Sequence, residues 1–431
     1  MHVLVIGATG LIGSATAARL LAEGNDVTGV ARRGQGSITP RMRFTELDIQ
    51  NVCIPEKWLP HLKGIDAVVN CAGVLQDTTR DSTALVHVAG PAALFTACEK
   101  AGVGRVIHVS AIGVDRNAPT AFSRSKAQGE AALISSSLDW VILRPAVVVG
   151  RVAYGGSALF RGLASLPLTP RLPAGGKLQV VQLDDLVSTI VYFLSPGAPS
   201  RMQLDIAGPE RLSLEDVVTS YRCWLGWKPA GRVSVPSWAL SAASRLGDLL
   251  GWFGWRSPIR STVHAEIMRG AIGDPERWTT TTGIQPQSLR AALACEPAGV
   301  QEAWFSRLYL LKPIVFATLS LFWISTGLVS MGPGWNNGIA LLHEGGITGI
   351  GAPLTLIAGT VTNLMIGVGI AFRRTARSVL YAALLLSLAY MLIGTILVPR
   401  LWIDPLGPLV KIWPVLALNL MALAIFEDRS G

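Results

Sequence analysis

Three glycines near the N-terminus are spaced for contact with an anion. Gly7, Gly10 and Gly13 follow an apolar run at 2–6 and precede residues 14–21, which have a helix-forming composition and an apolar face. A buried strand, a glycine-rich turn and a helix in this order present free backbone N–H groups to a phosphate. The sequence therefore predicts a site for a dinucleotide pyrophosphate, with the alternative that the turn is tight but binds nothing. The predicted contacts are Gly7, Thr9, Gly10, Leu11, Ile12 and Gly13.

Two arginines follow the second predicted strand, residues 26–31. In a doubly wound sheet this position faces the adenosine ribose, and an acidic residue there would accept a hydrogen bond from the 2′-hydroxyl of NAD. Arg32 and Arg33 instead offer guanidinium groups to a 2′-phosphate. The pair therefore favours NADP over NAD, and the alternative is two solvated surface arginines.

The ends of the next two predicted strands, 44–49 and 66–72, supply further cofactor contacts. The carboxylate of Asp48 is placed to accept a hydrogen bond from the adenine amino group. The small residues Ala72 and Gly73 leave room for a ribose on the strand end. The predicted contacts at these strand ends are Asp48, Ile49, Ala72 and Gly73.

Strands and helices alternate through this first part of the chain. A helix is predicted over residues 85–101, and strands are predicted over 105–110 and 140–143. Such an alternation specifies a parallel sheet with helices on both of its faces. We therefore predict an α/β fold with a doubly wound, Rossmann-type parallel sheet.

An ordered set of short motifs runs through the same part. GATGLIG, LDI, NCAGV, HVSAIG, FSRSK and LRPAVVVG begin at residues 7, 47, 70, 108, 122 and 143. In this order and spacing they resemble a short-chain dehydrogenase/reductase of the atypical or extended branch, over roughly residues 1–295. Within this branch, the chain resembles the group that contains the nucleotide-binding accessory subunit of respiratory complex I. The resemblance implies catalytic roles for Ser110 and Lys126 at the nicotinamide end of the cofactor, where Lys126 also binds the ribose.

One residue departs from the family pattern. The family's proton donor is a tyrosine four residues before the lysine, and this chain has Phe122 there. Phenylalanine has no proton to give, so the usual mechanism lacks its general acid. Tyr154, in a following loop, is an alternative donor, although a role in the pocket wall suits it better. The substitution therefore affects catalysis more than it affects binding.

The composition separates the chain into a polar part and an apolar part. Half of the residues are hydrophobic, 15% are charged and the mean hydropathy is +0.44, with the apolar excess concentrated after about residue 308. The net charge of +9 comes from scattered residues and not from a basic run, so nucleic acid is not an expected partner. A basic balance suits a domain held against an anionic membrane leaflet. The five cysteines form no CxxC pair and no metal site is predicted.

Four apolar segments in the last part are candidate membrane spans. They cover about 308–331, 351–372, 378–398 and 406–426, each long enough for a hydrocarbon core of ~30 Å. Arg373, Arg374 and Arg377 lie between the second and third segments, whereas residues 332–350 contain no Lys or Arg. The positive-inside rule therefore places both termini in the cytoplasm. The block resembles the DoxX-like family in size and layout, which implies a bacterial-type inner membrane.

Polar and aromatic residues add two open questions. Asn363 and Asn419 fall at membrane depth, where we expect them to form hydrogen bonds between helices. An apolar stretch between Trp224 and Trp255 is amphipathic. It is expected to line an apolar pocket, to lie on a membrane surface or to pack in the core.

These observations predict three segments and two alternative functions. Residues 1–295 form the NAD(P)-binding domain, 296–306 a linker and 307–431 a four-helix transmembrane domain. The first hypothesis is a membrane-anchored NAD(P)-dependent oxidoreductase acting on a lipid-like or quinone-like molecule. The alternative, which Phe122 favours, is a non-catalytic nucleotide-binding scaffold, assembly factor or redox sensor. The expected partners are the lipid bilayer and a small apolar substrate. The sequence does not decide whether the chain also forms a homo-oligomer or binds a membrane partner.

Overall fold

The computed structural model describes the chain except residues 34–39, 79, 117, 173–174, 256–258 and 427–431. Its described residues divide into two compact units. Unit 1 comprises residues 1–249 and 257–307, and unit 2 comprises 250–256 and 308–430. The domain boundaries that we expect from the sequence, at residues 295 and 307, remain predictions.

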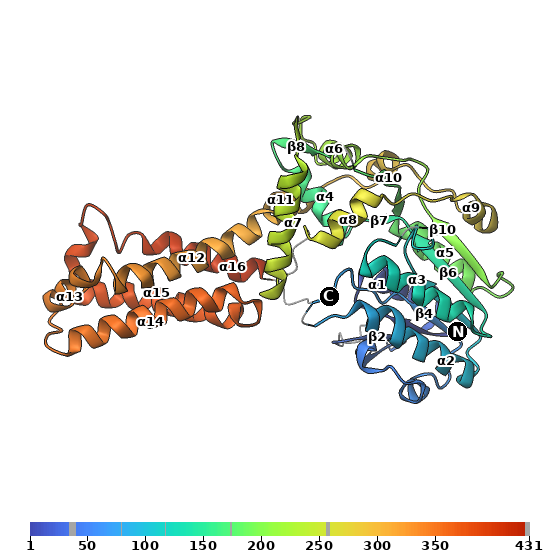
Figure 1. Cartoon of the computed structure of the whole chain (residues 1–431), viewed down its shortest axis with the longest axis horizontal. Helices are drawn as coiled ribbons and strands as arrows, with labels where there is room; N and C mark the ends of the chain where they lie inside the picture. Colours follow the sequence, from blue (N-terminus) through green and yellow to red (C-terminus); the bar gives the residue numbers. More distant parts are fainter. Residues whose placement is uncertain (34–39, 79, 117, 173–174, 256–258, 427–431) are drawn as a thin grey trace. The chain divides into compact units, whose positions relative to one another are not determined.

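Unit 1 is built on a seven-stranded parallel sheet with the order β10-β6-β5-β4-β1-β2-β3 (Figure 1). Its central strands are buried except for the first residues of β1 and β5, as expected for a parallel sheet covered on both faces. The predicted fold class is therefore confirmed. The strands are β1 (His2–Ile6), β2 (Asp26–Ala31), β3 (Met42–Glu46), β4 (Ala67–Asn70), β5 (Arg105–Val109), β6 (Trp140–Pro145) and β10 (Met202–Ile206).

Helices cover each face of the sheet and enclose two separate cores. On one face α1 (Leu11–Ala22) and α5 (Leu183–Leu194) pack on a cluster that includes Val5 and Phe193. On the other, α2 (Gly90–Ala101) and α3 (Ala121–Ile134) cover a cluster with Phe95 at its centre. This arrangement brings the carboxyl ends of the strands to one edge of the sheet, where α/β proteins bind their ligands.

Several predicted elements have different bounds in the structure, and two of them change in character. The third strand was expected over 44–49 but ends at Glu46, because the side chain of Asp48 caps a short 3₁₀ helix, η1 (Ile49–Asn51). The predicted helix 85–101 begins as a π-helical turn, η4 (Leu85–Ala89), before α2. A Cβ on Gly90 would lie 2.6 Å from Cγ1 of Ile49, so a glycine is needed where η4 meets α2.

The rest of unit 1 includes a third apolar cluster, which contains Phe160 and Tyr221. Its pairs of parallel strands are β7 (Val147–Val149) with β9 (Val180–Gln182), and β8 (Leu168–Arg171) with β11 (Gly231–Ser234). Its α-helices are α4 (Gly155–Ala164), α6 (Leu214–Trp224), α7 (Ser237–Trp252), α8 (Ser261–Arg269), α9 (Glu276–Thr282), α10 (Leu289–Cys295) and α11 (Val300–Tyr309). Two further 3₁₀ turns, η2 (Pro55–Lys57) and η3 (Leu59–His61), precede β4.

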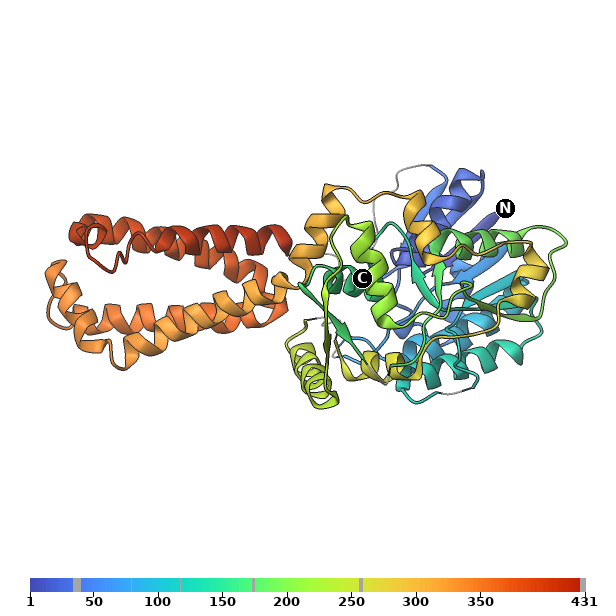
Figure 2. The ribbon, with the colours of Figure 1, turned by 90° about the horizontal axis from the view of Figure 1, so that it is seen from above.

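Unit 2 is helical, and Figure 2 shows its long helices side by side. Three of them are long and apolar enough to cross a membrane: α12 (Leu311–Met331), α14 (Gly351–Ala371) and α15 (Arg373–Leu397). The fourth predicted span, 406–426, forms a helix only over α16 (Ile412–Ile425), whose 14 residues fall short of the ~20 needed. The remaining elements are α13 (Trp335–Glu344) and η5 (Pro399–Trp402).

Small residues let the helices of unit 2 approach closely. A Cβ on Gly367 of α14 would lie 2.6 Å from Cγ1 of Ile324 on α12. A Cβ on Gly369 would lie 2.8 Å from Cγ2 of Val379 on α15. Such contacts are typical of helix packing within a bilayer. From the sequence we expected Arg373, Arg374 and Arg377 in a short loop between the second and third spans, but in the structure they lie in the first turns of α15.

Candidate functional site

The glycine-rich turn after β1 is packed too tightly for side chains. Gly7 has φ of +75°, a left-handed conformation that glycine adopts without strain. A Cβ on Gly13 would lie 2.2 Å from the carbonyl oxygen of Gly7. A Cβ on Gly7 would lie 3.1 Å from the backbone of Cys71 and Ala72. The turn therefore brings the ends of β1 and β4 into contact with the start of α1.

The first turn of α1 is open to an anion. Gly10 is its N-cap, no side chain caps it, and the first turn has no acidic residue. Its backbone N–H groups are thus available to a phosphate, which the helix dipole also attracts. Thr9, Leu11 and Ile12 are half-buried around this turn. The structure fits the pyrophosphate contact that the glycine spacing predicts.

Arg32, at the end of β2, has an acidic partner. Its Nη1 donates to Oδ1 of Asp81 at 2.5 Å, and the Asp81 side chain is 5% exposed. Asp81 therefore compensates part of the charge that would attract a 2′-phosphate. Arg33 is exposed, and the residues after it lie outside the described part of the chain. Sequence reasoning missed Asp81 because 49 residues separate it from Arg32.

Asp48 is held in a local network at the end of β3. Its Oδ1 accepts from the backbone N–H of Gln50 at 3.1 Å, and the amide side chain of Gln50 also contacts it. The Gln50 side chain in turn accepts from the N–H of Ser82 at 2.7 Å. Asp48 is half-buried, whereas its neighbour Ile49 is buried under η4. A carboxylate fixed in this way is preorganised to accept a further hydrogen bond.

The end of β4 lies beside α3. The N–H of Ala72 donates to Oδ1 of Asn70 at 3.1 Å, and the Asn70 amide nitrogen lies 3.1 Å from Nδ1 of His108. Gly73 is exposed, and a Cβ on it would lie 3.5 Å from Nζ of Lys126. The structure therefore brings together two predicted site residues that are 53 positions apart.

Lys126 is a buried cation whose donors are only partly used. Its Nζ donates to the carbonyl oxygens of Val109 at 2.9 Å and of Ala72 at 3.3 Å. An ammonium group has three donors, so one remains for a ligand hydroxyl. Burial lowers the pKa of Lys126 to about 8, opposed by the nearby Cys71 and Glu130. Lys126 is therefore mostly protonated at neutral pH, but its pKa lies only a little above that pH.

Buried contacts fix α3 in the position that Lys126 requires. Glu130, one turn after Lys126, forms an ion pair with Arg144 of β6, in which Nη2 lies 2.5 Å from Oε2. Both side chains are less than a tenth exposed. A Cβ on Gly129 would lie 2.2 Å from the carbonyl oxygen of His87, so α3 packs directly on η4. The helix begins with a capping box between Thr120 and Ser123.

Ser110 supplies an unpaired hydroxyl directly after β5. Its backbone N–H donates to the carbonyl oxygen of Leu143 at 2.7 Å. Its side chain is buried, and Oγ has no hydrogen-bond partner among the described residues. Buried hydroxyls are usually paired, so this group is suited to a ligand oxygen. Ser110 follows Val109, whose carbonyl oxygen accepts from Lys126, so the two predicted residues lie at the same strand end.

Phe122 lies one helical turn before Lys126 and contacts a histidine that the sequence did not single out. Its ring stands edge-on to His87, with the centroids 5.6 Å apart. His87 Nε2 accepts from the N–H of Val74 at 3.0 Å, so its Nδ1 carries the proton and donates to Ser125 Oγ at 2.8 Å. Burial lowers the pKa of His87 to about 2. Both ring nitrogens are used, and His87 has no proton to offer a substrate.

Tyr154 and the acidic and thiol groups add little to this site. Tyr154 is 44% exposed at the N-cap of α4. Among the described residues, no group of three or more His, Cys, Asp or Glu side chains is placed to hold a metal ion. The site can thus bind an anionic nucleotide, and it offers a buried ammonium group and an unpaired hydroxyl group to a ligand.

Two family models match separate parts of the chain. Residues 7–155 match the NAD(P)H-binding family, and residues 320–420 match the DoxX-like family. The first match covers the glycine turn, Ser110 and Lys126, and the second covers most of unit 2. The predicted combination of an NAD(P)-binding Rossmann domain with a DoxX-like domain is confirmed.

Curated relatives match between about half and 70% of the chain. An uncharacterized protein of Mycobacterium tuberculosis is 27% identical over 220 residues, which are 51% of this chain but 23% of the relative. Sterol demethylase protein B of Methylococcus capsulatus is 26% identical over 338 residues, 70% of this chain and 99% of the relative. NADH dehydrogenase [ubiquinone] 1 alpha subcomplex subunit 9 of Arabidopsis thaliana is 30% identical, covering 48% of this chain and 53% of the relative.

Solved structures share the fold of unit 1. The Bordetella bronchiseptica enzyme WbmG in complex with NAD aligns with a TM-score of 0.54 at 18% identity, over 71% of this chain and 94% of that one. At this identity the likeness concerns the fold alone. The shared fold is the Rossmann-type parallel sheet with its flanking helices.

Proposed function

We propose that this chain, an NAD(P)-binding Rossmann domain joined to a DoxX-like domain, is a membrane-anchored oxidoreductase for a lipid-like substrate. The reaction would transfer a hydride between the nicotinamide and the carbon of a ketone or secondary alcohol, with a proton moving to or from its oxygen. The observation that carries the proposal is that an unpaired Ser110 hydroxyl follows Val109, the residue whose carbonyl oxygen holds the buried Lys126 ammonium.

The cofactor contacts proposed from the sequence suit the geometry of the strand ends. Gly7, Gly10 and Gly13, with the N–H groups of Leu11 and Ile12, would hold the pyrophosphate. Asp48 and Ile49 would hold the adenine, Ala72, Gly73 and Lys126 the nicotinamide ribose, and Arg32 and Arg33 the phosphate of NADP if that is the cofactor. The bound nicotinamide would supply the hydride.

Ser110 and Lys126 would serve the substrate oxygen. The Ser110 hydroxyl would donate a hydrogen bond that orients the carbonyl oxygen. Lys126, whose pKa of about 8 keeps it mostly charged at neutral pH, would place its positive charge near that oxygen, and the proton that the family takes from tyrosine would come from water. Because Phe122 has no hydroxyl and both nitrogens of His87 are engaged, we expect a slower reaction than in a tyrosine-containing relative.

Three observations support a lipid-like substrate. The name of the Methylococcus relative refers to sterols, and unit 2 has three helices suited to a bilayer. The two buried residues of helix α7 are small, whereas four of its large apolar residues are exposed, the reverse of a core-packed helix. Its buried residues are Ser244 and Gly247, and its exposed ones are Trp238, Leu246, Leu249 and Trp252. Exposed tryptophans and leucines on one helix face are typical of contact with a membrane surface.

The proposal can be tested with full-length protein in lipid nanodiscs. NADPH and NADH consumption would be followed with the lipid extract of the native membrane and with ketosteroids as probes. We expect Ser110→Ala and Lys126→Met to abolish turnover, whereas the exposed substitutions Ser135→Ala and Lys63→Met should leave it unchanged. Turnover that survives in Ser110→Ala and Lys126→Met would contradict the assigned site.

A non-catalytic role is the second candidate, and Phe122 favours it. In this case the domain would bind the nucleotide as a scaffold, assembly factor or sensor, and the complex I subunit among the relatives supports such a role. Saturable nucleotide binding without turnover of any lipid in the extract would favour this candidate over the first.

We also propose that both termini lie in the cytoplasm of a bacterial-type inner membrane, which requires the apolar segment at 406–426 to make a fourth crossing although its helix, α16, has only 14 residues. Arg373, Arg374 and Arg377 gather at the start of α15, whereas residues 332–350 have no Lys or Arg. On the opposite side Arg400 forms an ion pair with Glu344, so part of its charge is compensated.

A further inference from the structure

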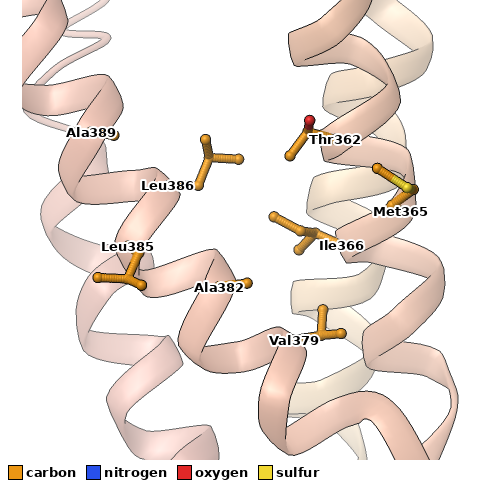
Figure 3. Close-up of a pocket in the computed structure, with 8 residues that line it drawn as sticks. All are labelled: Thr362, Met365, Ile366, Val379, Ala382, Leu385, Leu386 and Ala389. Atoms are coloured by element: carbon orange, nitrogen blue, oxygen red, sulfur yellow. The ribbon is translucent and has the colours of Figure 1, made fainter.

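An apolar pocket of about 550 Å³ lies between α14 and α15 of unit 2 (Figure 3). Ile366 of α14 and Leu386 of α15 point into the space between the two helices, and both also belong to the apolar core of unit 2. Met365 and Leu385, which line the same pocket, are 61% and 67% exposed. The pocket is therefore a groove with the core of unit 2 on one side and the surroundings of unit 2 on the other. We call it the α14–α15 groove.

A hydrogen bond between the two helices marks one end of the α14–α15 groove. The Tyr390 hydroxyl donates to Oδ1 of Asn363 at 3.1 Å, which links α15 to α14 as the sequence predicts for Asn363. The similar bond that we expected for Asn419 is not found among the described residues, and that part of the prediction is wrong. Thr362 and Ala389, which line the groove, are the sequence neighbours of Asn363 and Tyr390. The groove therefore ends at the level of this hydrogen bond.

The α14–α15 groove has the depth of one lipid leaflet. Along α15 it runs from Val379 to Ala389, a rise of about 15 Å at 1.5 Å per residue. On α14 it reaches from Thr362, near the middle of the helix, toward the end of the helix at Ala371. The hydrocarbon core of a bilayer is ~30 Å thick, so one leaflet takes up about 15 Å of it. The groove thus lies in the leaflet on the side where α14 ends and α15 begins.

A basic side chain lies beyond the groove on that side. Arg374, in the first turn of α15, is exposed and forms no ion pair within the described part of the chain. Arg374, the exposed Ser378 and Leu385 follow one another at spacings of four and seven residues, so all three lie on one face of α15.

The position of Arg374 along the helix matches the level of a lipid headgroup. Arg374 precedes Val379, the first groove residue of α15, by roughly 8 Å along the helix axis. The polar headgroup region is about 5–8 Å thick on each side of a bilayer. A lipid with its chain in the groove would therefore have its phosphate at the level of Arg374.

We propose that the α14–α15 groove binds an acyl chain of an anionic phospholipid, whose phosphate pairs with Arg374. The groove provides an apolar surface of the right depth for the chain. The guanidinium donates two parallel hydrogen bonds to phosphate oxygens, and the Ser378 hydroxyl supplies a further donor. A neutral lipid would fill the groove as well but would leave the charge of Arg374 without a counter-charge. This site requires only that unit 2 crosses a bilayer, and not that unit 1 is catalytic.

The test compares two photoactivatable phospholipids that differ only in their headgroup. Phosphatidylglycerol and phosphatidylcholine with the same diazirine-bearing acyl chain would each be added in trace amounts to full-length protein in nanodiscs of the two unlabelled lipids. Labelled peptides would be identified by mass spectrometry after irradiation. We expect phosphatidylglycerol to label Met365 and Leu385 about fivefold more than phosphatidylcholine does, as is typical of one basic residue near an anionic surface. Arg374→Gln should remove this preference, and Arg374→Lys should retain it.

Two matched controls use exposed positions of the same unit. Arg377→Gln removes an equal charge near the same end of α15, but Arg377 is five residues from Ala382 and so lies on a different face of the helix. It should keep the preference for phosphatidylglycerol. Ala382→Leu, which fills the groove, should reduce labelling of the groove by both lipids at least threefold. Ala317→Leu, the same enlargement on the exposed face of α12, should not reduce it.

Four results would overturn the proposal. The first is equal labelling of the groove by the two lipids in the parent protein, which would show that any acyl chain binds there. The second is a preference lost equally in Arg374→Gln and Arg377→Gln, which would reflect general surface charge. The third is labelling that Ala382→Leu leaves unchanged, because the chain would then lie elsewhere on unit 2. The fourth is a dimer without lipid label in the groove, because a second copy of the chain would then occupy it.

Discussion

The Phe122 ring stands edge-on to His87, with ring centroids 5.6 Å apart and planes at 79°. His87 is itself fixed by hydrogen bonds to Val74 and Ser125. The ring of residue 122 is therefore held rigidly, one turn before Lys126, where a relative of this type would have its tyrosine. The position keeps the shape of an active site but lacks the proton donor.

Restoring that donor is the first prediction. Phe122→Tyr adds one hydroxyl, and the positive charge of Lys126 would lower its pKa. General acid catalysis typically contributes 10²–10⁴-fold, so we expect reduction of a carbonyl probe to accelerate by roughly 10²-fold or more. Steady-state kinetics in nanodiscs would measure it. Phe305→Tyr, a half-buried control on α11, should have no effect. An unchanged rate in Phe122→Tyr, with a parent that already turns over briskly, would point to another donor such as Tyr154.

The pKa of Lys126 predicts how nucleotide affinity depends on pH. Burial lowers this pKa from its usual value to about 8, so the ammonium is charged below pH 8 and increasingly neutral above it. Affinity for NAD(P)H should therefore fall as the pH rises through about 8. Calorimetric titration between pH 6.5 and 9.5, ~1.5 units either side, would measure the change. Lys126→Met should bind more weakly and show no such dependence. A parent affinity that is flat across this range would contradict the role of Lys126.

The same shift has a consequence for stability. In the unfolded chain the lysine holds its proton up to a higher pH than in the folded protein, so between these two pKa values the unfolded state binds more protons. The contribution of Lys126 to folding stability should therefore increase as the pH rises above about 8, and the penalty for its burial should be largest below that pH.

The contact between Arg32 and Asp81 gives a prediction about cofactor preference. The two arginines favour NADPH, so replacing Arg32 and Arg33 together with alanine should erase that preference at a cost of about 1–3 kcal/mol. Asp81→Asn should increase the preference, because it removes the negative charge that compensates Arg32. Dissociation constants for NADPH and NADH would be compared. Equal affinities of the parent protein for NADPH and NADH would contradict the assignment of NADP.

Membrane topology is open to a direct check. Reporter fusions at Gly338, in α13, should lie outside the cytoplasm, and fusions at Ala376, near the start of α15, should lie inside. Alkaline phosphatase and green fluorescent protein report the two sides. The reverse pattern would show that the distribution of Lys and Arg is misleading here, for which Arg400 and Lys411 on the opposite side offer a reason.

The sequence predicts those parts of the structure that local chemistry determines. Gly7 adopts the left-handed conformation for which its glycine is suited, and the strands and helices around it form the predicted parallel sheet. Contacts between residues that are far apart in the sequence could not be predicted. His87 and Ser125 are 38 positions apart, and neither has a local pattern that indicates their hydrogen bond.

In the membrane segments, too, local patterns were predictable from the sequence and contacts between helices were not. Hydropathy identifies the apolar stretch at 406–426 but not where its helix begins. Pro405, Gly407 and Pro408 keep the first part out of the helix, since proline lacks an N–H and clashes with the preceding turn. Pro414 is tolerated because it falls in the first turn of α16. The unpaired state of Asn419 depends on its neighbours across the bundle and could only be found in the structure.

Direct transfer of an isotope tests the central claim most sharply. The protein in native-lipid nanodiscs would be given NADPH, and separately NADH, deuterated at the transferable position of the nicotinamide, and the lipids would then be analysed by mass spectrometry. The account predicts deuterium on the carbon of one hydroxylated lipid, absent in Ser110→Ala and in Lys126→Met and retained in Lys63→Met. Saturable nucleotide binding with no deuterium in any lipid would contradict it.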